Sequence, residues 1–146
     1  MKKDQYPIFF RAYENSDFHE VEKMLNLLSK VPLRSEKEIY KIHRQIINYP
    51  QNHRFVGVQN DEIVCHGVCI FDLKIRGDIC CHLEDIVVKE SMQRKGIGKL
   101  LISYLVEFAK KNNCYKVMTT TQENNRKFYE SCGLSLNGIE MKLSLK

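Results

Sequence analysis

Two glycines stand at the start of a predicted long helix, beside several basic residues. Gly96 and Gly98 follow an apolar run at 86–88 and a short polar turn. Glycines at a helix N-terminus let backbone N–H groups approach an anion, which the helix dipole also favours. The third glycine of a dinucleotide fingerprint and the Gly-Lys-Ser/Thr of a nucleotide P-loop are both missing. The pattern predicts a diphosphate-binding loop formed by Arg94, Lys95, Gly96, Ile97, Gly98 and Lys99.

A tyrosine and two adjacent carboxylates have the residue types that acid–base chemistry needs. Tyr129 is predicted on a short helix directly after a strand, where its phenol is either a candidate general acid or a packed aromatic ring. Glu84 and Asp85 are neighbours on a predicted strand, so their side chains point to opposite faces and cannot act as a pair on one atom. Each is either an exposed strand residue or a carboxylate that serves a ligand.

The periodicity of apolar residues predicts the elements that position these groups. Asp17 with Glu20 and Ser35 with Glu38 have capping-box spacing, so a helix is predicted at each place. Apolar residues at helical spacing mark a third helix, with one face formed by Ile97, Leu100, Leu101, Tyr104, Leu105 and Phe108. Strands are predicted at 9–13, 54–59, 62–73, 79–88, 114–121 and 139–145, and a fourth helix at 124–131. The order βααβββαβαβ predicts an α/β (α+β) fold, in which helices cover both faces of a mixed, mostly antiparallel sheet.

Composition excludes several classes of protein. A chain of 146 residues fits one domain over 1–146, and its net charge of +5 is spread along the chain rather than gathered into a nucleic-acid-binding stripe. None of the six cysteines forms a Cys-x-x-Cys pair, which favours reduced thiols over a metal site or disulfides. Without a signal-like run or eighteen consecutive apolar residues, we expect a cytoplasmic protein that does not enter a membrane.

Five segments carry a resemblance to a known family. LEDIVV, QRKGIGKLLI, NNCYKV, NNRKFYESCG and GIEMKL occur in an order and spacing that resemble the glucosamine 6-phosphate N-acetyltransferase family of the GCN5-related N-acetyltransferase (GNAT) superfamily. Gln93-x-x-Gly96-x-Gly98 is similar to the acetyl-CoA loop of that superfamily. The resemblance covers most of residues 79–143. It implies the GNAT fold, and transfer of acetyl from acetyl-CoA to the 2-amino group of D-glucosamine 6-phosphate by direct attack in a ternary complex. It also implies a homodimer with sites near the interface.

The resemblance assigns roles to individual residues. It implies that Tyr129 lies near the CoA sulfur and that Asn125 contacts CoA, while the backbone of Ile86, Val87 and Val88 pairs with the pantetheine amides as an added strand would. Lys116 is the leading candidate for the sugar phosphate. The full set of substrate-binding candidates is Ser29, Lys74, Arg76, Glu84, Asp85, Tyr115 and Lys116.

The chain departs from the family pattern at two positions. Thr120 stands where relatives carry an acid near the reaction centre, which leaves the base that deprotonates the amine open. Ser144 stands where relatives carry a substrate-contacting arginine, for which Lys142 or Lys146 is a candidate replacement. His66 and His82 are interpreted as strand or surface residues rather than catalytic bases. The alternatives are another amine acceptor, such as a protein or a polyamine, and a non-catalytic module that binds acyl-CoA or nucleic acid.

Overall fold

The computed structural model describes residues 7–146, and its sheet has five strands in the order β1-β2-β3-β4-β5. Each of the first four strands is antiparallel to its neighbour, whereas β5 runs parallel to β4. This confirms the prediction of a mixed, mostly antiparallel sheet. The domain predicted over 1–146 includes residues 1–6, which lie outside the described residues. The strands are β1 (Phe9–Ala12), β2 (Asn52–Gln59), β3 (Glu62–Leu73), β4 (Ile79–Val88) and β5 (Cys114–Thr119).

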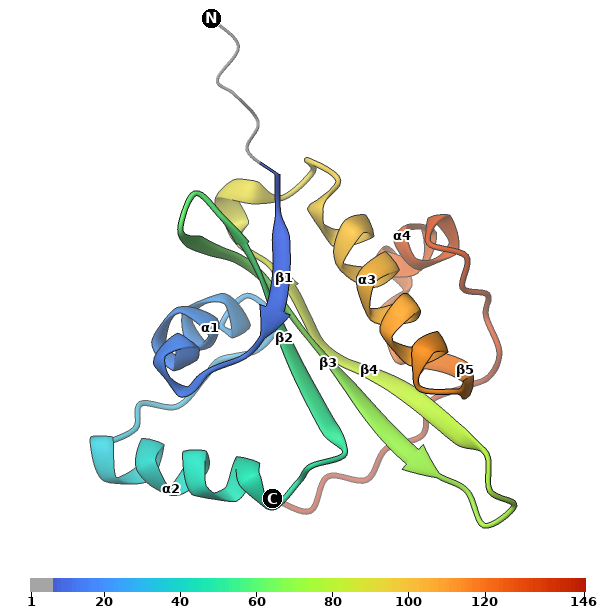
Figure 1. Cartoon of the computed structure of the whole chain (residues 1–146), viewed down its shortest axis with the longest axis horizontal. Helices are drawn as coiled ribbons and strands as arrows, with labels where there is room; N and C mark the ends of the chain where they lie inside the picture. Colours follow the sequence, from blue (N-terminus) through green and yellow to red (C-terminus); the bar gives the residue numbers. More distant parts are fainter. Residues whose placement is uncertain (1–6) are drawn as a thin grey trace, which may run out of the picture.

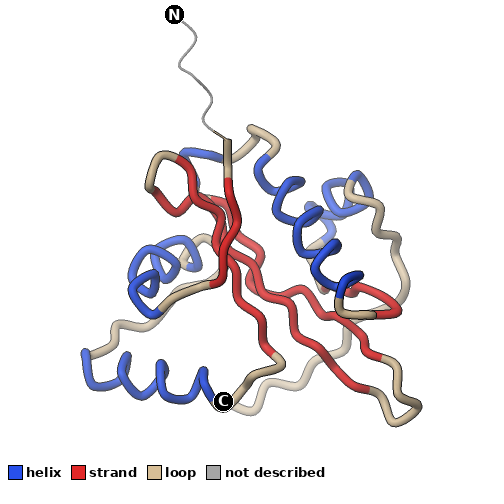
Figure 2. Tube along the Cα trace, viewed as in Figure 1, coloured by secondary structure: helices blue, strands red, loops and turns tan. Residues whose placement is uncertain are grey.

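Helices cover both faces of the sheet, as predicted. Helices α1 (Phe18–Leu25) and α2 (Glu36–Ile47) lie on one side, and α3 (Ile97–Lys111) and α4 (Arg126–Ser131) lie on the other (Figure 1). Three short 3-10 turns, η1 (Asn15–Asp17), η2 (Glu90–Met92) and η3 (Glu123–Asn125), lead into α1, toward α3 and into α4. The long helix α3 lies across the sheet in both drawings (Figures 1 and 2).

Local capping explains where two of the helices begin. Ser35 and Glu38 form the predicted capping box, because each side chain accepts a hydrogen bond from the other residue's backbone N–H. The box predicted for Asp17 with Glu20 is wrong. Asp17 instead accepts a 2.8 Å bond from the backbone N–H of Glu14 and is held by two hydrogen bonds from Arg11. The capping box is instead formed by Glu14 with Asp17 at the start of η1, and α1 begins at the residue after Asp17.

Each face of the sheet has its own apolar core. On the α3 side, the helix buries Leu101, Ile102 and Leu105 against β3 and β4. On the other side, α1 packs Val21 and Met24 against a smaller set of valines from β2 and β4. The predicted apolar face of α3 is confirmed except at Leu100, whose side chain is about half exposed (53%). All six cysteines are free, as expected from their spacing.

The final strand predicted at 139–145 does not form. Residues 134–146 contain no helix or strand, and Figure 2 draws them as a loop. The apolar side chains that produced the alternating pattern are almost fully exposed, with Ile139 at 93% and Met141 at 92%. A strand needs a neighbour that accepts and donates its backbone hydrogen bonds, and the described part of this chain offers this segment none.

Candidate active site

The strands β4 and β5 separate halfway along β4. Their pairing begins at Ile79 with Cys114 and ends at Leu83 with Thr119. Thr119 Oγ1 donates a 3.2 Å hydrogen bond to the carbonyl oxygen of Leu83, which ties the strands together at their last pair. Beyond this point residues 84–88 pair with β3 alone. One backbone edge of β4 is therefore open for an extended ligand.

A β-bulge lies where the opening begins. Glu84 pairs with Val68 and Val87 pairs with His66, so Gly67 alone stands opposite the two residues Asp85 and Ile86. Asp85 has φ of 50°, the left-handed conformation that one class of bulge requires. The sequence analysis treated this strand as regular, and the bulge corrects that assumption. The site carboxylates lie on an irregular backbone whose shape depends on β3.

Tyr129 lies where the opening begins. It belongs to α4 and is within hydrogen-bonding reach of the Thr119 side chain. Burial raises the pKa of the Tyr129 phenol above its ordinary value of 10, the charge of Glu84 contributes to the rise, and the Thr119 hydrogen bond opposes it in part. A phenol that stays protonated near a reacting group can donate its proton, so the geometry suits a general acid.

The predicted loop precedes α3, and its two glycines serve different purposes. Gly96 has φ of 82° and is the residue before the helix. A Cβ at Gly98 would lie 3.1 Å from the Phe128 ring, so a side chain there would require that ring to shift. In the described chain no side chain caps this helix, so its first N–H groups point out of the helix end. Gln93 Nε2 donates to the carbonyl oxygen of Val88 at 3.2 Å and ties the loop to the end of β4.

Contact between α4 and α3 places the tyrosine. Phe128 packs against Gly98, and Tyr129 meets the Phe128 ring edge to face at 5.0 Å. Asn125 directly precedes α4 and is exposed on the same side of the sheet. The predicted cofactor residues of the loop and of α4 are therefore brought together around the open half of β4.

A cavity of about 330 Å³ lies on the opposite face of the sheet, between α1, the segment that follows it and α2. Ser29 and Asp85 both line it, so two of the predicted substrate-binding residues lie in the same cavity. It also holds three cationic side chains that the sequence analysis did not select, Lys30, Arg34 and Arg54. Arg34 is paired with Glu22 at 3.3 Å.

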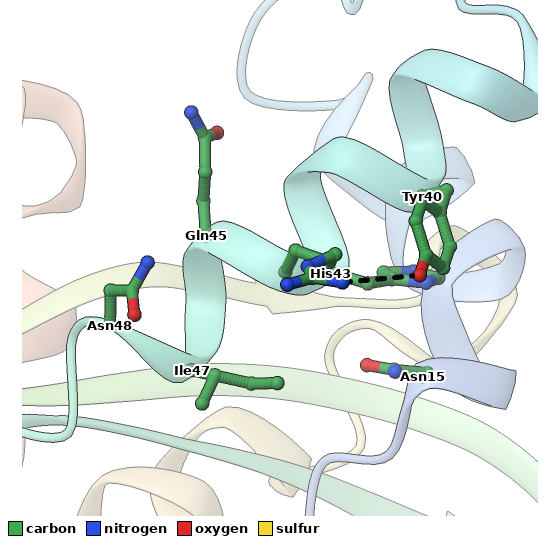
Figure 3. A pocket seen from close by; sticks show the side chains of 7 residues that line it. Asn15, Tyr40, His43, Gln45, Ile47 and Asn48 are labelled. Atoms are coloured by element: carbon green, nitrogen blue, oxygen red, sulfur yellow. Dashed lines mark hydrogen bonds between the residues drawn. The ribbon is translucent and has the colours of Figure 1, made fainter.

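A second hollow, of about 410 Å³, is formed mostly by α2. Figure 3 shows Asn15 and residues of α2 around it, with Arg44 donating to the hydroxyl of Tyr40 at 3.5 Å. None of the predicted site residues lines this hollow. The cavity that holds Asp85 is therefore the better candidate for the acceptor.

The basic residues predicted for the phosphate gather elsewhere in this chain. Lys116 pairs with Cys80 in the sheet, its ammonium lies 5.1 Å from the Tyr115 ring, and Lys74 is in contact with Asp72. Arg76 belongs to the turn between β3 and β4. None of these three basic residues lines the 330 Å³ cavity, and neither does Tyr115. Asp85 lies five positions after Cys80 in β4, which corresponds to about 16 Å of strand.

Sequence reasoning missed two residues that the structure places beside the bulge and the opening. His66 was predicted to be a strand or surface residue; it lies in β3, where it is buried and its ring nitrogen bonds to the backbone of Asp85. Thr119 joins β4 to Tyr129, although attention had fallen on its neighbour Thr120. A lone histidine or threonine in a strand carries no spacing signal, so neither could be found without the strand pairing.

Residues 7–146 contain neither a cluster of metal-binding side chains nor a helix that could span a membrane. No group of three or more histidine, cysteine or acidic side chains there is arranged to hold a metal ion. No helix in the described part of the chain is long and apolar enough to cross a bilayer.

Comparisons with known proteins agree with this geometry. The model of the acetyltransferase (GNAT) family matches residues 18–134. The glucosamine 6-phosphate N-acetyltransferase of Trypanosoma brucei brucei is 39% identical over 146 residues, covering 92% of this chain and 94% of that protein. The glucosamine 6-phosphate N-acetyltransferase of Candida albicans is 28% identical, and the match covers 90% of this chain and 92% of that protein.

A solved structure has the same fold. The crystal structure of glucosamine-6-phosphate N-acetyltransferase from Arabidopsis thaliana superposes with a TM-score of 0.86 at 25% identity, covering 96% of this chain and 99% of that one. The family model spans most of the chain, and a relative above 30% identity is matched over nearly its whole length. The chain belongs to the acetyltransferase (GNAT) family and, within it, to the glucosamine 6-phosphate N-acetyltransferases.

Proposed function

We propose that this protein transfers acetyl from acetyl-CoA to the 2-amino group of D-glucosamine 6-phosphate by direct attack in a ternary complex. The observation that carries the proposal is the opening between β4 and β5, with Tyr129, Thr119 and Glu84 at its base. The helix end of α3 lies beside one side of it, and the cavity that contains Asp85 lies on the other face of the sheet. Relatives that bear this activity in their names support the choice of acceptor.

The residues present fit acetyl-CoA as a substrate. Its diphosphate suits the uncapped N-terminus of α3, with Gly96 left-handed and cations at Arg94, Lys95 and Lys99. The open backbone edge of Ile86, Val87 and Val88 suits the amides of an extended pantetheine chain. Asn125, exposed before α4, would complete this set.

The chemistry divides between two groups of residues. The amine nitrogen forms a bond to the thioester carbon and the carbon–sulfur bond breaks. Tyr129 would then give its proton to the departing thiolate, and it would take back the second proton that the nitrogen loses on becoming an amide. Glu84 or Asp85 would accept the proton that the ammonium must lose, since Thr120 carries no carboxylate. The charge of Glu84 acts on the Tyr129 phenol and adds to the effect of burial in raising its pKa, whereas Asp85 lines the acceptor cavity.

The sugar phosphate needs a cationic partner, and the chain offers two separate groups. The family resemblance favours Lys116, with Lys74 and Arg76. The cavity itself is lined by Arg54, by Arg34, which is paired with Glu22, and by Lys30, which directly follows the predicted substrate residue Ser29. Because Lys30 shares a cavity with Asp85 and Lys116 does not, we place the phosphate contact made within one chain at Lys30. Lys116 would serve only if a second copy brings it to the cavity.

The test is CoA release measured across amino sugars with and without the 6-phosphate. A charge-assisted hydrogen bond contributes about 1.5–3 kcal/mol, so one lost contact should lower kcat/KM roughly tenfold to a hundredfold. Lys30→Ala should show this loss on the phosphorylated sugar and little change on plain glucosamine, and Lys116→Ala is the matched comparison. Equal wild-type activity on both sugars would contradict the sugar-phosphate assignment and favour another amine acceptor.

We further propose that the protein acts as a homodimer in the cytoplasm. Residues 136–145 carry five exposed apolar side chains, four of them at alternate positions, and β5 ends the described sheet with an open edge. A second copy would cover this segment and so remove apolar surface from water. Four buried free cysteines fit a reducing compartment.

Sedimentation analysis can test the dimer directly. Ile139→Asp with Met141→Asp should shift the protein from dimer to monomer, because the two carboxylates would have to lose their water in the interface. Leu33→Asp is the control, since Leu33 is equally exposed but lies outside the segment. A wild-type monomer at all concentrations would contradict the proposal.

A further inference from the structure

We propose that His66 is a positioning residue that holds the Asp85 bulge in the shape that the acetyl-CoA site needs. The inference rests on the proposed function only in its use of the open edge of β4 for acetyl-CoA. Its starting point is a single contact. His66 Nδ1 lies 3.0 Å from the carbonyl oxygen of Asp85, and the histidine is only 3% exposed.

The bulge needs such a contact because its backbone is costly. Asp85 has φ of 50°, a conformation that aspartate adopts more readily than most residues but less readily than glycine. β3 leaves space for it with Gly67, where a Cβ would lie only 2.9 Å from the Ile86 side chain. The space left by the missing side chain at Gly67 permits the bulge. The hydrogen bond from His66 holds the peptide group between Asp85 and Ile86 in place.

The contact also sets the state of the imidazole ring. A carbonyl oxygen only accepts hydrogen bonds, so Nδ1 of His66 must carry a proton. Burial lowers the pKa of His66, which favours the neutral ring with its proton on Nδ1. The groups that face the ring are Asp85, Asp17, Arg54 and the Tyr13 ring, whose centroid lies 6.3 Å away. Asp17 is already engaged by Arg11.

The position of the bulge connects this bond to acetyl-CoA. Asp85 directly precedes residues 86–88, whose open backbone edge is proposed to pair with the pantetheine amides. A shift of register by one residue reverses the two faces of a strand. A change in the peptide group between Asp85 and Ile86 would likewise change the directions of the N–H and C=O groups that follow it. His66 would therefore act on acetyl-CoA through Asp85 and without touching it.

Two substitutions separate the hydrogen bond from the packing. His66→Leu keeps apolar volume but removes the donor. His66→Asn places an amide N–H close to where Nδ1 stood, and so restores the donor. Acetyl-CoA affinity, measured by titration calorimetry without acceptor, should weaken about fivefold to tenfold in His66→Leu and return to within about twofold in His66→Asn. His82→Leu, on a half-exposed histidine of β4, should leave the affinity unchanged.

A double-mutant cycle tests the mechanism even if His66→Leu is poorly stable. Asp85→Gly removes the cost of the left-handed backbone, so adding His66→Leu to it should weaken acetyl-CoA binding much less than His66→Leu does alone. Equal losses in both backgrounds would overturn the inference. So would a failure of His66→Asn to restore affinity. If the wild-type protein itself did not bind acetyl-CoA, the proposed function would fail instead, which distinguishes the two results.

Discussion

The two halves of β4 lie in one strand but in different surroundings. Residues 79–83 pair with β3 on one side and β5 on the other, and Cys80, Cys81 and Leu83 are buried. Residues 84–88 pair with β3 alone and contain the left-handed Asp85. The first half is a regular part of the core. In the part of the chain that the structure describes, the second half has backbone groups on one edge that pair with no other strand.

The difference shows how one strand can provide both stability and a binding edge. In the first half, strands on both sides satisfy the hydrogen bonds of the backbone. Its main contribution to stability therefore comes from the burial of apolar side chains. In the second half, backbone groups left open on one side become available to a ligand, at the cost of a less regular strand. Thr119 and Leu83 mark the boundary with their 3.2 Å hydrogen bond. Substitutions on the two sides of that boundary should therefore have different effects.

Removing the Tyr129 hydroxyl should give the largest change in activity. Tyr129→Phe keeps the ring that packs on Phe128 but removes the proton donor. A general acid contributes about 10²–10⁴-fold, so kcat should fall by that factor while the KM for acetyl-CoA changes little. Steady-state kinetics measure this. Tyr104→Phe, in the packed core of α3, is the control. If the kcat of Tyr129→Phe stayed within about threefold of the wild-type value, Tyr129 would be a packing residue rather than a general acid.

A cavity in the first half of β4 should cost stability and leave the chemistry intact. Leu83 is 1% exposed, so Leu83→Ala should lower the free energy of unfolding by about 2–5 kcal/mol. Denaturant unfolding gives this value. The kcat of the folded fraction should stay close to that of the wild type, because the hydrogen bond from Thr119 goes to the Leu83 backbone. A selective loss of kcat would show that the two halves are not independent.

A charge in the loop should weaken acetyl-CoA binding while the fold persists. Gly96→Glu puts a carboxylate where the diphosphate is proposed to bind, and we expect the Kd for acetyl-CoA to rise about tenfold or more. Gly77→Glu is a matched control, since both glycines have positive φ with open space around them. Any effect of backbone strain is then shared. Equal affinities in a folded Gly96→Glu variant would show that the loop does not hold the diphosphate.

Acidification should cause the smallest effect, and the pKa directions give its sign. Burial lowers the pKa of His66 and of His53 from 6.5 in the folded protein. The unfolded chain therefore binds more protons below about pH 6.5, and stability should fall as the pH drops through that value. Unfolding curves between pH 8 and pH 5 measure the loss. His66→Asn should remove the part due to His66, and an unchanged pH dependence would show that His66 does not contribute.

Sequence patterns predicted the elements wherever short-range rules decide the structure. The capping box at Ser35, the strand ranges near the centre of the sheet and the glycine loop before α3 all follow from neighbours within a few residues. The bulge at Asp85 does not, because LEDIVV is compatible with a regular strand. Its left-handed residue is explained only by Gly67 and His66, which are 18 and 19 residues away in the chain.

The sequence by itself determined the mixed sheet with helices on both faces, the uncapped glycine loop at the start of a long helix, and the types of residue that acetyl transfer requires. Only the tertiary structure decided where β4 and β5 separate, which cations share a cavity with Asp85, and that residues 139–145 form no strand in this chain. The physical reason is the range of the forces involved. Helix caps and apolar periodicity act between near neighbours, whereas register, bulges and cavities depend on which distant backbones meet.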